Sequence, residues 1–167
     1  MGGFHIREAR DADWPSCWRI IQPVFAAGET YPAYGGIDSE EARAYWMVSA
    51  RKTYVAVDED GSLLGTYYLR PNQPGRGDHV CNCGYVTADV ARGRGIATAM
   101  CEHSQREATR LGFTAMQFNL VVATNTAAVR LWRKLGFEII GTLPGVFRHD
   151  RLGPVDAHVM FKQLSGG

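Results

Sequence analysis

The chain has 167 residues, a hydrophobic fraction of 46% and a charged fraction of 21%, which together are typical of one globular domain. The net charge of +1 argues against broad binding to nucleic acid or a membrane surface, and no apolar run is long enough to cross a bilayer. The four cysteines form no CxxC pair and no export signal precedes them, so we expect free thiols, no structural metal and a cytoplasmic location.

Hydrophobic periodicity, capping residues and glycines predict eleven regular elements. In chain order they are a strand at 4–9, helices at 11–27 and 38–50, strands at 53–57, 63–69 and 79–88, a helix at 95–111, a strand at 114–121, a helix at 125–135, and strands at 137–141 and 155–164. A helix between the fourth and fifth strands implies that those two run parallel, whereas the hairpins are antiparallel. The predicted fold class is therefore a mixed α/β sheet.

An Arg-Gly segment, residues 92–97, joins the fourth strand to the long helix and is suited to binding a phosphate. The first turn of a helix leaves about four backbone N–H groups unpaired, glycines let an anion approach them, and Arg92 and Arg94 add positive charge. The segment has no Walker A string and lacks the last glycine of GxGxxG, but it fits R-x-x-G-x-A. A plain strand-to-helix turn is the alternative.

This segment resembles the Q/R-x-x-G-x-G/A motif of the GNAT superfamily of N-acetyltransferases. Downstream, residues 125–137 (NTAAVRLWRKLGF) are similar to the family's N-x-x-A-x-x-L-Y-x-K-L-G-F segment, and the two motifs occur in the family's order. The resemblance covers residues 4–164 and implies a single GNAT domain. Its fold would be a mixed, mostly antiparallel seven-stranded sheet with four main helices, in which the parallel fourth and fifth strands splay apart.

The resemblance also implies that acetyl-CoA is the co-substrate, with no metal. Its pantetheine chain would lie between the splayed strands and pair with the fourth strand, its pyrophosphate would sit on residues 92–97, and the helix after Asn125 would line the other side. The implied cofactor-binding residues are Val86, Thr87, Arg92, Gly93, Arg94, Gly95, Ile96, Ala97, Asn125, Ala128 and Trp132.

Two positions depart from the family's chemistry. Members often carry a Glu general base on the fourth strand and a Tyr that protonates the leaving thiolate, and this chain has Asn82 and Trp132 there. Neither side chain can do that proton transfer at neutral pH. Asn82 is still the candidate catalytic residue, because strand alternation puts it beside Gly84 and Val86 on one face, next to the implied cofactor. The alternative is an Asn that only satisfies the backbone where the strands splay.

Residues 79–84 and 118–125 are similar to the yeast-type proline-analogue N-acetyltransferases, which acetylate L-azetidine-2-carboxylate and related imino acids. In that group the Asn at position 82 serves catalysis and the Asn at 125 serves cofactor binding. The loop at residues 28–32 is similar to the group's substrate loop. The candidate substrate residues are Glu29, Thr30, Tyr31, Tyr67 and Asn119, and Tyr34 and Tyr68 are further candidates for the pocket wall.

The expected activity is transfer of acetyl from acetyl-CoA to the amine of a small molecule, an amino or imino acid, by direct attack on the thioester. Alternatives are an acetyltransferase for an amino-acid antibiotic such as phosphinothricin or for a protein N-terminus, and an idle acyl-CoA-binding sensor, which the loss of Glu and Tyr favours.

His79, Cys81 and Cys83 alternate about 6.8 Å apart along one strand, which is more typical of buried thiols than of a metal site. We expect no nucleic acid or membrane partner, and the sequence leaves undecided whether the protein forms a homodimer.

Overall fold

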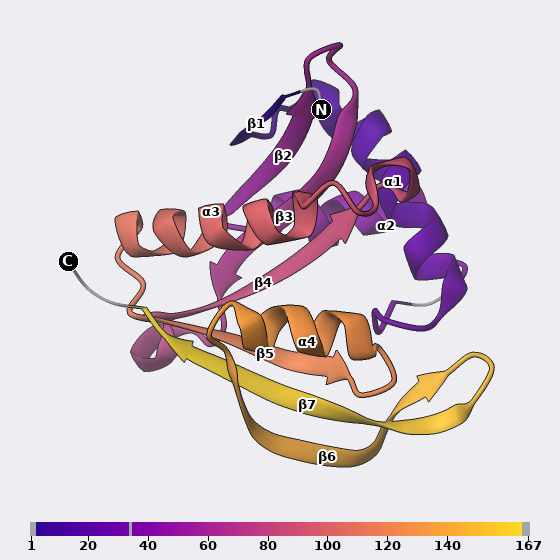
Figure 1. Cartoon of the computed structure of the whole chain (residues 1–167), viewed down its shortest axis with the longest axis vertical. Helices are drawn as coiled ribbons and strands as arrows, with labels where there is room; N and C mark the ends of the chain where they lie inside the picture. The colour runs from indigo at the N-terminus through magenta and orange to yellow at the C-terminus, as the bar shows by residue number, and fades with distance from the viewer. Residues whose placement is uncertain (1–2, 34, 165–167) are drawn as a thin grey trace.

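The computed structural model describes residues 3–33 and 35–164. Within them, seven strands form one sheet in the order β1-β2-β3-β4-β5-β7-β6, in which β4 and β5 are parallel and the other neighbours antiparallel (Figure 1). The strands are β1 (Phe4–Glu8), β2 (Lys52–Asp58), β3 (Leu63–Pro71), β4 (Val80–Thr87), β5 (Ala115–Val122), β6 (Glu138–His149) and β7 (Gly153–Gln163). The main helices are α1 (Trp14–Ala27), α2 (Ser39–Arg43), α3 (Ile96–Arg110) and α4 (Thr126–Lys134). This architecture confirms the predicted fold class.

The sheet separates two hydrophobic cores. On one face α1 and α2 pack over β2, with Phe25 and Trp46 fully buried. On the other face α3 and α4 cover the sheet, with Met100 and Phe113 at the centre of the core. β4 contributes to both cores because its side chains alternate between the faces, and this makes it the strand around which a site can be built.

The helix predicted over residues 38–50 divides into two parts. The capping box is present, since the Glu41 backbone N–H donates to the Asp38 carboxylate at 2.9 Å and Asp38 N–H donates to Glu41 at 3.3 Å. After α2, however, residues Ala44–Val48 form a π-helical turn. Turns of this kind occur often at functional sites because they shift a side chain out of helical register.

The last hairpin is longer than predicted. The strand expected at 137–141 runs as β6 to His149, and β7 begins at Gly153. Pro144 and Gly145 are residue types common in turns, but they lie where the register of β6 against β7 shifts, between Leu143 and Phe147, and Gly145 has φ +60. A β-bulge absorbs such residues without ending the strand.

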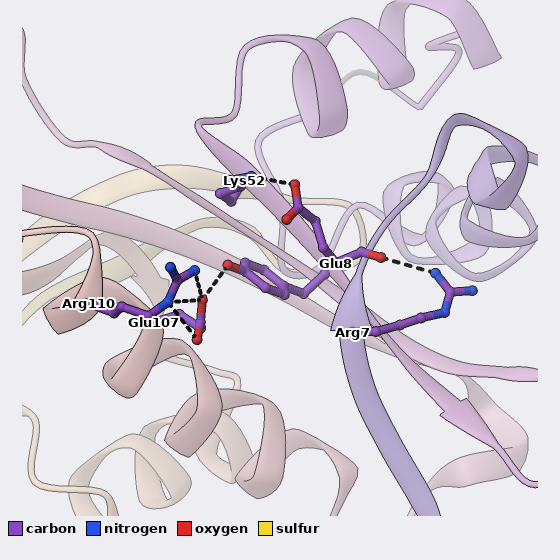
Figure 2. A network of polar contacts seen from close by, with 6 residues as sticks. Arg7, Glu8, Lys52, Glu107 and Arg110 are labelled. Carbon is purple, nitrogen blue, oxygen red and sulfur yellow. Dashed lines mark hydrogen bonds and ion pairs between the residues drawn. The ribbon is translucent and has the colours of Figure 1, made fainter.

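A polar contact ties α3 to the sheet. Tyr54 on β2 donates its hydroxyl hydrogen to Glu107 at 2.7 Å, and Arg110 pairs with the same carboxylate at 2.6 Å (Figure 2). The hydrogen bond from the Arg110 guanidinium holds the pKa of Glu107 below its ordinary value of 4.5. A carboxyl group whose pKa is lower in the folded state stabilises the fold above its unfolded pKa, and the contribution is lost as pH falls through the folded pKa.

We therefore expect Glu107→Gln to remove part of the acid-induced loss of stability. The free energy of unfolding in urea, measured at about pH 7 and about pH 3, should differ less between the two pH values in the variant than in the wild type. Glu102→Gln, at an exposed position on the same helix, is the control. The same pH dependence in Glu107→Gln as in the wild type would contradict this role.

Candidate functional site

β4 and β5 pair only at their first residues and then diverge (Figure 1). The last paired residues are Cys81 and Met116. One step further, the side chain of Asn82 donates a hydrogen bond from Nδ2 to the carbonyl of Gln117 at 2.9 Å. The Asn82 amide thus takes the place of a backbone contact and closes the narrow end of the opening between the strands.

The backbone of β4 alternates between bonding β3 and facing the opening. Ala88 N–H donates to the carbonyl of Leu64 at 2.9 Å, so the even-numbered residues of β4 bond β3. The backbone groups of Tyr85 and Thr87 therefore face the opening. The prediction that the cofactor pairs with the strand near Val86 and Thr87 needs a correction at Val86, whose backbone is turned to β3.

A cavity of about 460 Å³ fills the opening between β4 and β5 and extends to the loop after α1 and to α4. It brings together many of the residues singled out from the sequence: Thr30, Tyr31, Tyr68, Asn82, Val86, Thr87, Arg92, Asn119, Asn125, Ala128 and Trp132. Other lining residues were not singled out one by one: Pro32, Phe118 and Leu120 lie within the segments 28–32 and 118–125, whereas Val24 and Tyr45 belong to no such segment. None of the described lining residues is Asp, Glu or His, so the described part of the wall offers no carboxylate or imidazole base.

A second cavity of about 300 Å³ lies at the N-terminus of α3 and is lined by Arg92, Gly93, Gly95, Ile96 and Ala97. It shares Thr87 and Arg92 with the first, so the two line one continuous surface. Gly95 caps α3 without a side-chain hydrogen bond and has φ +77. The first-turn N–H groups of this 15-residue helix therefore face a surface at which no side chain of the described residues caps them.

The side chain of Arg94 does not line this second cavity. Its guanidinium pairs with Asp58 on β2 at 2.8 Å, and it lines neither cavity. Arg92 lines both cavities, and its side chain is 77% exposed and pairs with Asp89 at 2.8 Å. Of the two predicted phosphate-binding arginines, the structure brings only Arg92 to the cavities, because Asp58 holds Arg94 against β2.

Two predicted substrate residues also lie elsewhere. Tyr67 is fully buried, and its hydroxyl lies 2.7 Å from Nδ1 of His103 on α3, on the far side of the sheet from the acceptor side of the cavity. Its neighbour Tyr68 faces the cavity instead, as strand alternation requires. Glu29 does not line the cavity but pairs with Arg151 at 2.6 Å. Tyr34 lies outside the described residues.

Tyr45, Tyr68 and Asn82 form a hydrogen-bonded chain on the α1 side of the opening, and Tyr31 lies beside it. Tyr31 donates to the carbonyl of Tyr85 at 3.0 Å, and Tyr68 donates to Oδ1 of Asn82 at 3.3 Å. The hydroxyls of Tyr45 and Tyr68 lie 3.2 Å apart. Burial raises the pKa of Tyr31 and of Tyr68, so both hydroxyls keep their hydrogen at neutral pH and act as donors.

Gly84 makes room for these side chains. A Cβ at position 84 would lie 2.5 Å from Cε1 of Tyr68 and 2.8 Å from the Tyr31 hydroxyl, so the rings would have to move. We expect Gly84→Ala to cost about 1–3 kcal/mol of stability, as overpacking does, and to displace both tyrosines. Urea unfolding measures the cost. Gly141→Ala, at a strand glycine with no atom within 4 Å of its Cβ position, is the matched control, and equal stability of the two variants would contradict the close fit.

In the described part of the chain, no group of three or more His, Cys, Asp or Glu side chains is placed to hold a metal ion. No described helix is both long and apolar enough to span a membrane.

Comparison with known proteins gives a consistent family assignment. Residues 13–137 match the model of the acetyltransferase (GNAT) family. The N-acetyltransferase aca1 of Schizosaccharomyces pombe is 38% identical over 155 residues, covering 91% of this chain and 65% of that protein. The L-methionine sulfoximine/L-methionine sulfone acetyltransferase of Pseudomonas aeruginosa is 32% identical over 149 residues, 84% of each chain.

A solved structure is more similar still. The GCN5-related N-acetyltransferase from Kribbella flavida has a TM-score of 0.92 and 44% identity, covering 96% of this chain and 98% of that one. The chain spans less than two thirds of the length of the S. pombe relative, and smaller shares of the yeast protein SPT10 and of a mycothiol acetyltransferase.

Proposed function

The chain belongs to the acetyltransferase (GNAT) family, and we propose that it transfers acetyl from acetyl-CoA to the amine of a small molecule, an amino or imino acid. The observation that carries the proposal is the opening between β4 and β5, which leaves backbone groups of β4 without a strand partner beside an uncapped helix N-terminus. A ligand with an amide-containing arm and a pyrophosphate fits both features.

The residues that would hold acetyl-CoA are distributed along the two cavities. The backbone of Tyr85 and Thr87 offers hydrogen bonds to the pantetheine arm, and residues 92–97 with the first turn of α3 offer N–H donors to the pyrophosphate. Asn125 caps α4 by accepting from Ala128 N–H at 3.3 Å, which holds its side chain at this end of the cavity. When bound, acetyl-CoA supplies the thioester whose acyl carbon the amine attacks.

The chain's own residues contribute positioning rather than proton transfer. The Asn82 amide is held by Gln117 and Tyr68. One of its N–H groups has no partner among the described residues and can donate to a reacting oxygen, and its Oδ1 can accept from an amine N–H. Only a neutral amine can attack the thioester. Because no described carboxylate or imidazole lines the cavity, the proton that the nitrogen loses on attack goes to water, and water protonates the leaving CoA thiolate. Trp132 packs against Tyr85 with ring centroids 5.1 Å apart and acts as cavity wall rather than as a thiolate acid.

The proposed acceptor class has two supports. The asparagines at 82, 119 and 125 match the motif that the chain shares with proline-analogue acetyltransferases, and all three line the cavity. The Pseudomonas relative is named for two amino-acid derivatives, L-methionine sulfoximine and L-methionine sulfone.

The direct test is a thiol-release assay with acetyl-CoA over a panel of free amino acids, imino acids, simple amines and short peptides. We expect turnover with at least one amino or imino acid, and an acetylated product by mass spectrometry. Tight acetyl-CoA binding without turnover of any amine would contradict the enzymatic proposal and favour the sensor alternative. Preference for peptides would overturn the acceptor class.

A further inference from the structure

Arg70 on β3 is a cation without an acidic partner among the described residues. Its one side-chain hydrogen bond there runs from Nη2 to the backbone carbonyl of Tyr45, while Nε is buried and has no partner. Its guanidinium carbon lies 3.9 Å from the ring centroid of Tyr68 and 4.6 Å from that of Tyr45. Unsatisfied buried donors are rare in native folds, so this group calls for an explanation.

The position of Arg70 relates this charge to the cavity. It is the cross-strand partner of Asn82, so both side chains lie on the same face of the sheet. The two rings on which it stacks both line the cavity. The positive charge therefore stands directly behind the cavity wall, at the end where Asn82 closes the opening.

A ligand in the cavity would contact the Tyr45 hydroxyl, and the Arg70 guanidinium stacked on that ring would act on it from behind the wall. Tyr45 lies in the π-helical turn after α2 and remains 37% exposed, whereas Tyr68 is 3% exposed. Tyr68 can keep its bond to Asn82 while Tyr45 turns its hydroxyl hydrogen away from Tyr68 toward a ligand. A hydroxyl next to a stacked guanidinium is a better donor to an anion than a hydroxyl alone, because both interactions favour negative charge.

We propose that Arg70 and Tyr45 form a subsite for the carboxylate of the acceptor, in which the Tyr45 hydroxyl contacts the carboxylate and Arg70 supplies the positive charge. The inference rests on the proposed acetyl transfer and specifies its acceptor as an α-amino or α-imino acid. In such molecules the nitrogen is two bonds from the carboxylate carbon. Binding at Tyr45 thus leaves the nitrogen close to Tyr68 and Asn82, the next groups in the hydrogen-bonded chain.

The test compares acceptors that differ only in the carboxylate: L-azetidine-2-carboxylate against azetidine, and L-methionine sulfone against 3-(methylsulfonyl)propylamine. The wild type should prefer the acid of each pair. Arg70→Met should raise KM for the acids by about tenfold or more and change KM for the two amines by about twofold at most. Arg70→Lys keeps the charge but loses the planar stack, so its KM for the acids should lie between those of the wild type and Arg70→Met. Tyr45→Phe should also raise KM for the acids.

Arg51→Met is the matched control, because Arg51 also stacks on an aromatic ring, 5.3 Å from the centroid of Phe113, but that ring does not line the cavity. It should leave the preference for the acids unchanged. Equal losses for acids and amines in Arg70→Met would mean that Arg70 only supports the fold, and a wild type without preference for the acids would overturn the subsite.

A binding measurement separates this inference from the proposed function. Calorimetry with L-azetidine-2-carboxylate on the CoA-saturated protein needs no turnover. Binding that Arg70→Met abolishes would support the subsite even if the thiol-release assay failed for every amine, a result that would contradict only the proposed transfer. Binding with the same affinity in the wild type and Arg70→Met, or binding to neither, would overturn the subsite.

Discussion

Asn82→Ala should lower kcat by roughly 10²–10³, which is the loss expected when one preorganised hydrogen bond to the reacting group is removed. The side chain lines the cavity at its closed end, fixed by Gln117 on one side and Tyr68 on the other. A catalytic role predicts that the affinity for acetyl-CoA stays near normal while kcat falls. A purely structural role predicts the reverse, because losing the contact to Gln117 would widen the opening and weaken cofactor binding.

Asn82→Asp distinguishes positioning from base chemistry. If Asn82 orients an amine that is already neutral, a carboxylate beside the thioester should not restore activity, since it cannot donate to the developing negative charge. If a base acting through water is needed there, the Asp variant should remain active and gain an acidic limb in its pH–rate profile. Full activity of Asn82→Ala would exclude Asn82 from catalysis.

Gly95→Asp should weaken acetyl-CoA binding at least about tenfold, or ~1.4 kcal/mol, measured by calorimetry. Gly95 lines the second cavity at the N-terminus of α3, where a carboxylate would occupy the donors and repel the pyrophosphate. The fold should persist, because Asp tolerates positive φ better than most residues, is a favoured N-cap, and its Cβ would meet no atom within 4 Å.

Gly95→Asn is the matched control for charge. It has nearly the shape of Asp and the same tolerance of positive φ, but it carries no charge. Its affinity for acetyl-CoA should lie between those of the wild type and Gly95→Asp. Unchanged affinity in Gly95→Asp would remove this loop from the cofactor site.

The elements could be predicted where local chemistry determines them. The capping box at Asp38, the glycine stops and the alternation of β4 all depend on residues close together in the chain, and each is present in the structure. The last hairpin could not be bounded because Pro144 and Gly145 are typical of a turn. Only the register against β7 shows that a bulge accommodates them.

The motifs of the site could be predicted from the sequence, but the contacts between residues far apart in the sequence could not. Two neighbouring tyrosines in β3 necessarily face opposite sides, yet only the placement of α3 shows that Tyr67 meets His103. Arg94 was predicted with Arg92 to add positive charge at the loop, and its pairing with Asp58 depends on how β2 packs beside the loop. Tyr45 and Arg70 belong to no motif, and they become relevant only when the π-helical turn after α2 packs against β3.

The most direct measurement of the central claim is a crystal structure with acetyl-CoA bound. The account predicts that the pantetheine arm lies between β4 and β5, hydrogen-bonded to the backbone of Tyr85 or Thr87, with the pyrophosphate on residues 92–97 and the thioester within reach of Asn82. Acetyl-CoA bound elsewhere on the protein, or with its thioester on the α3 side of the sheet beside Tyr67, would contradict it.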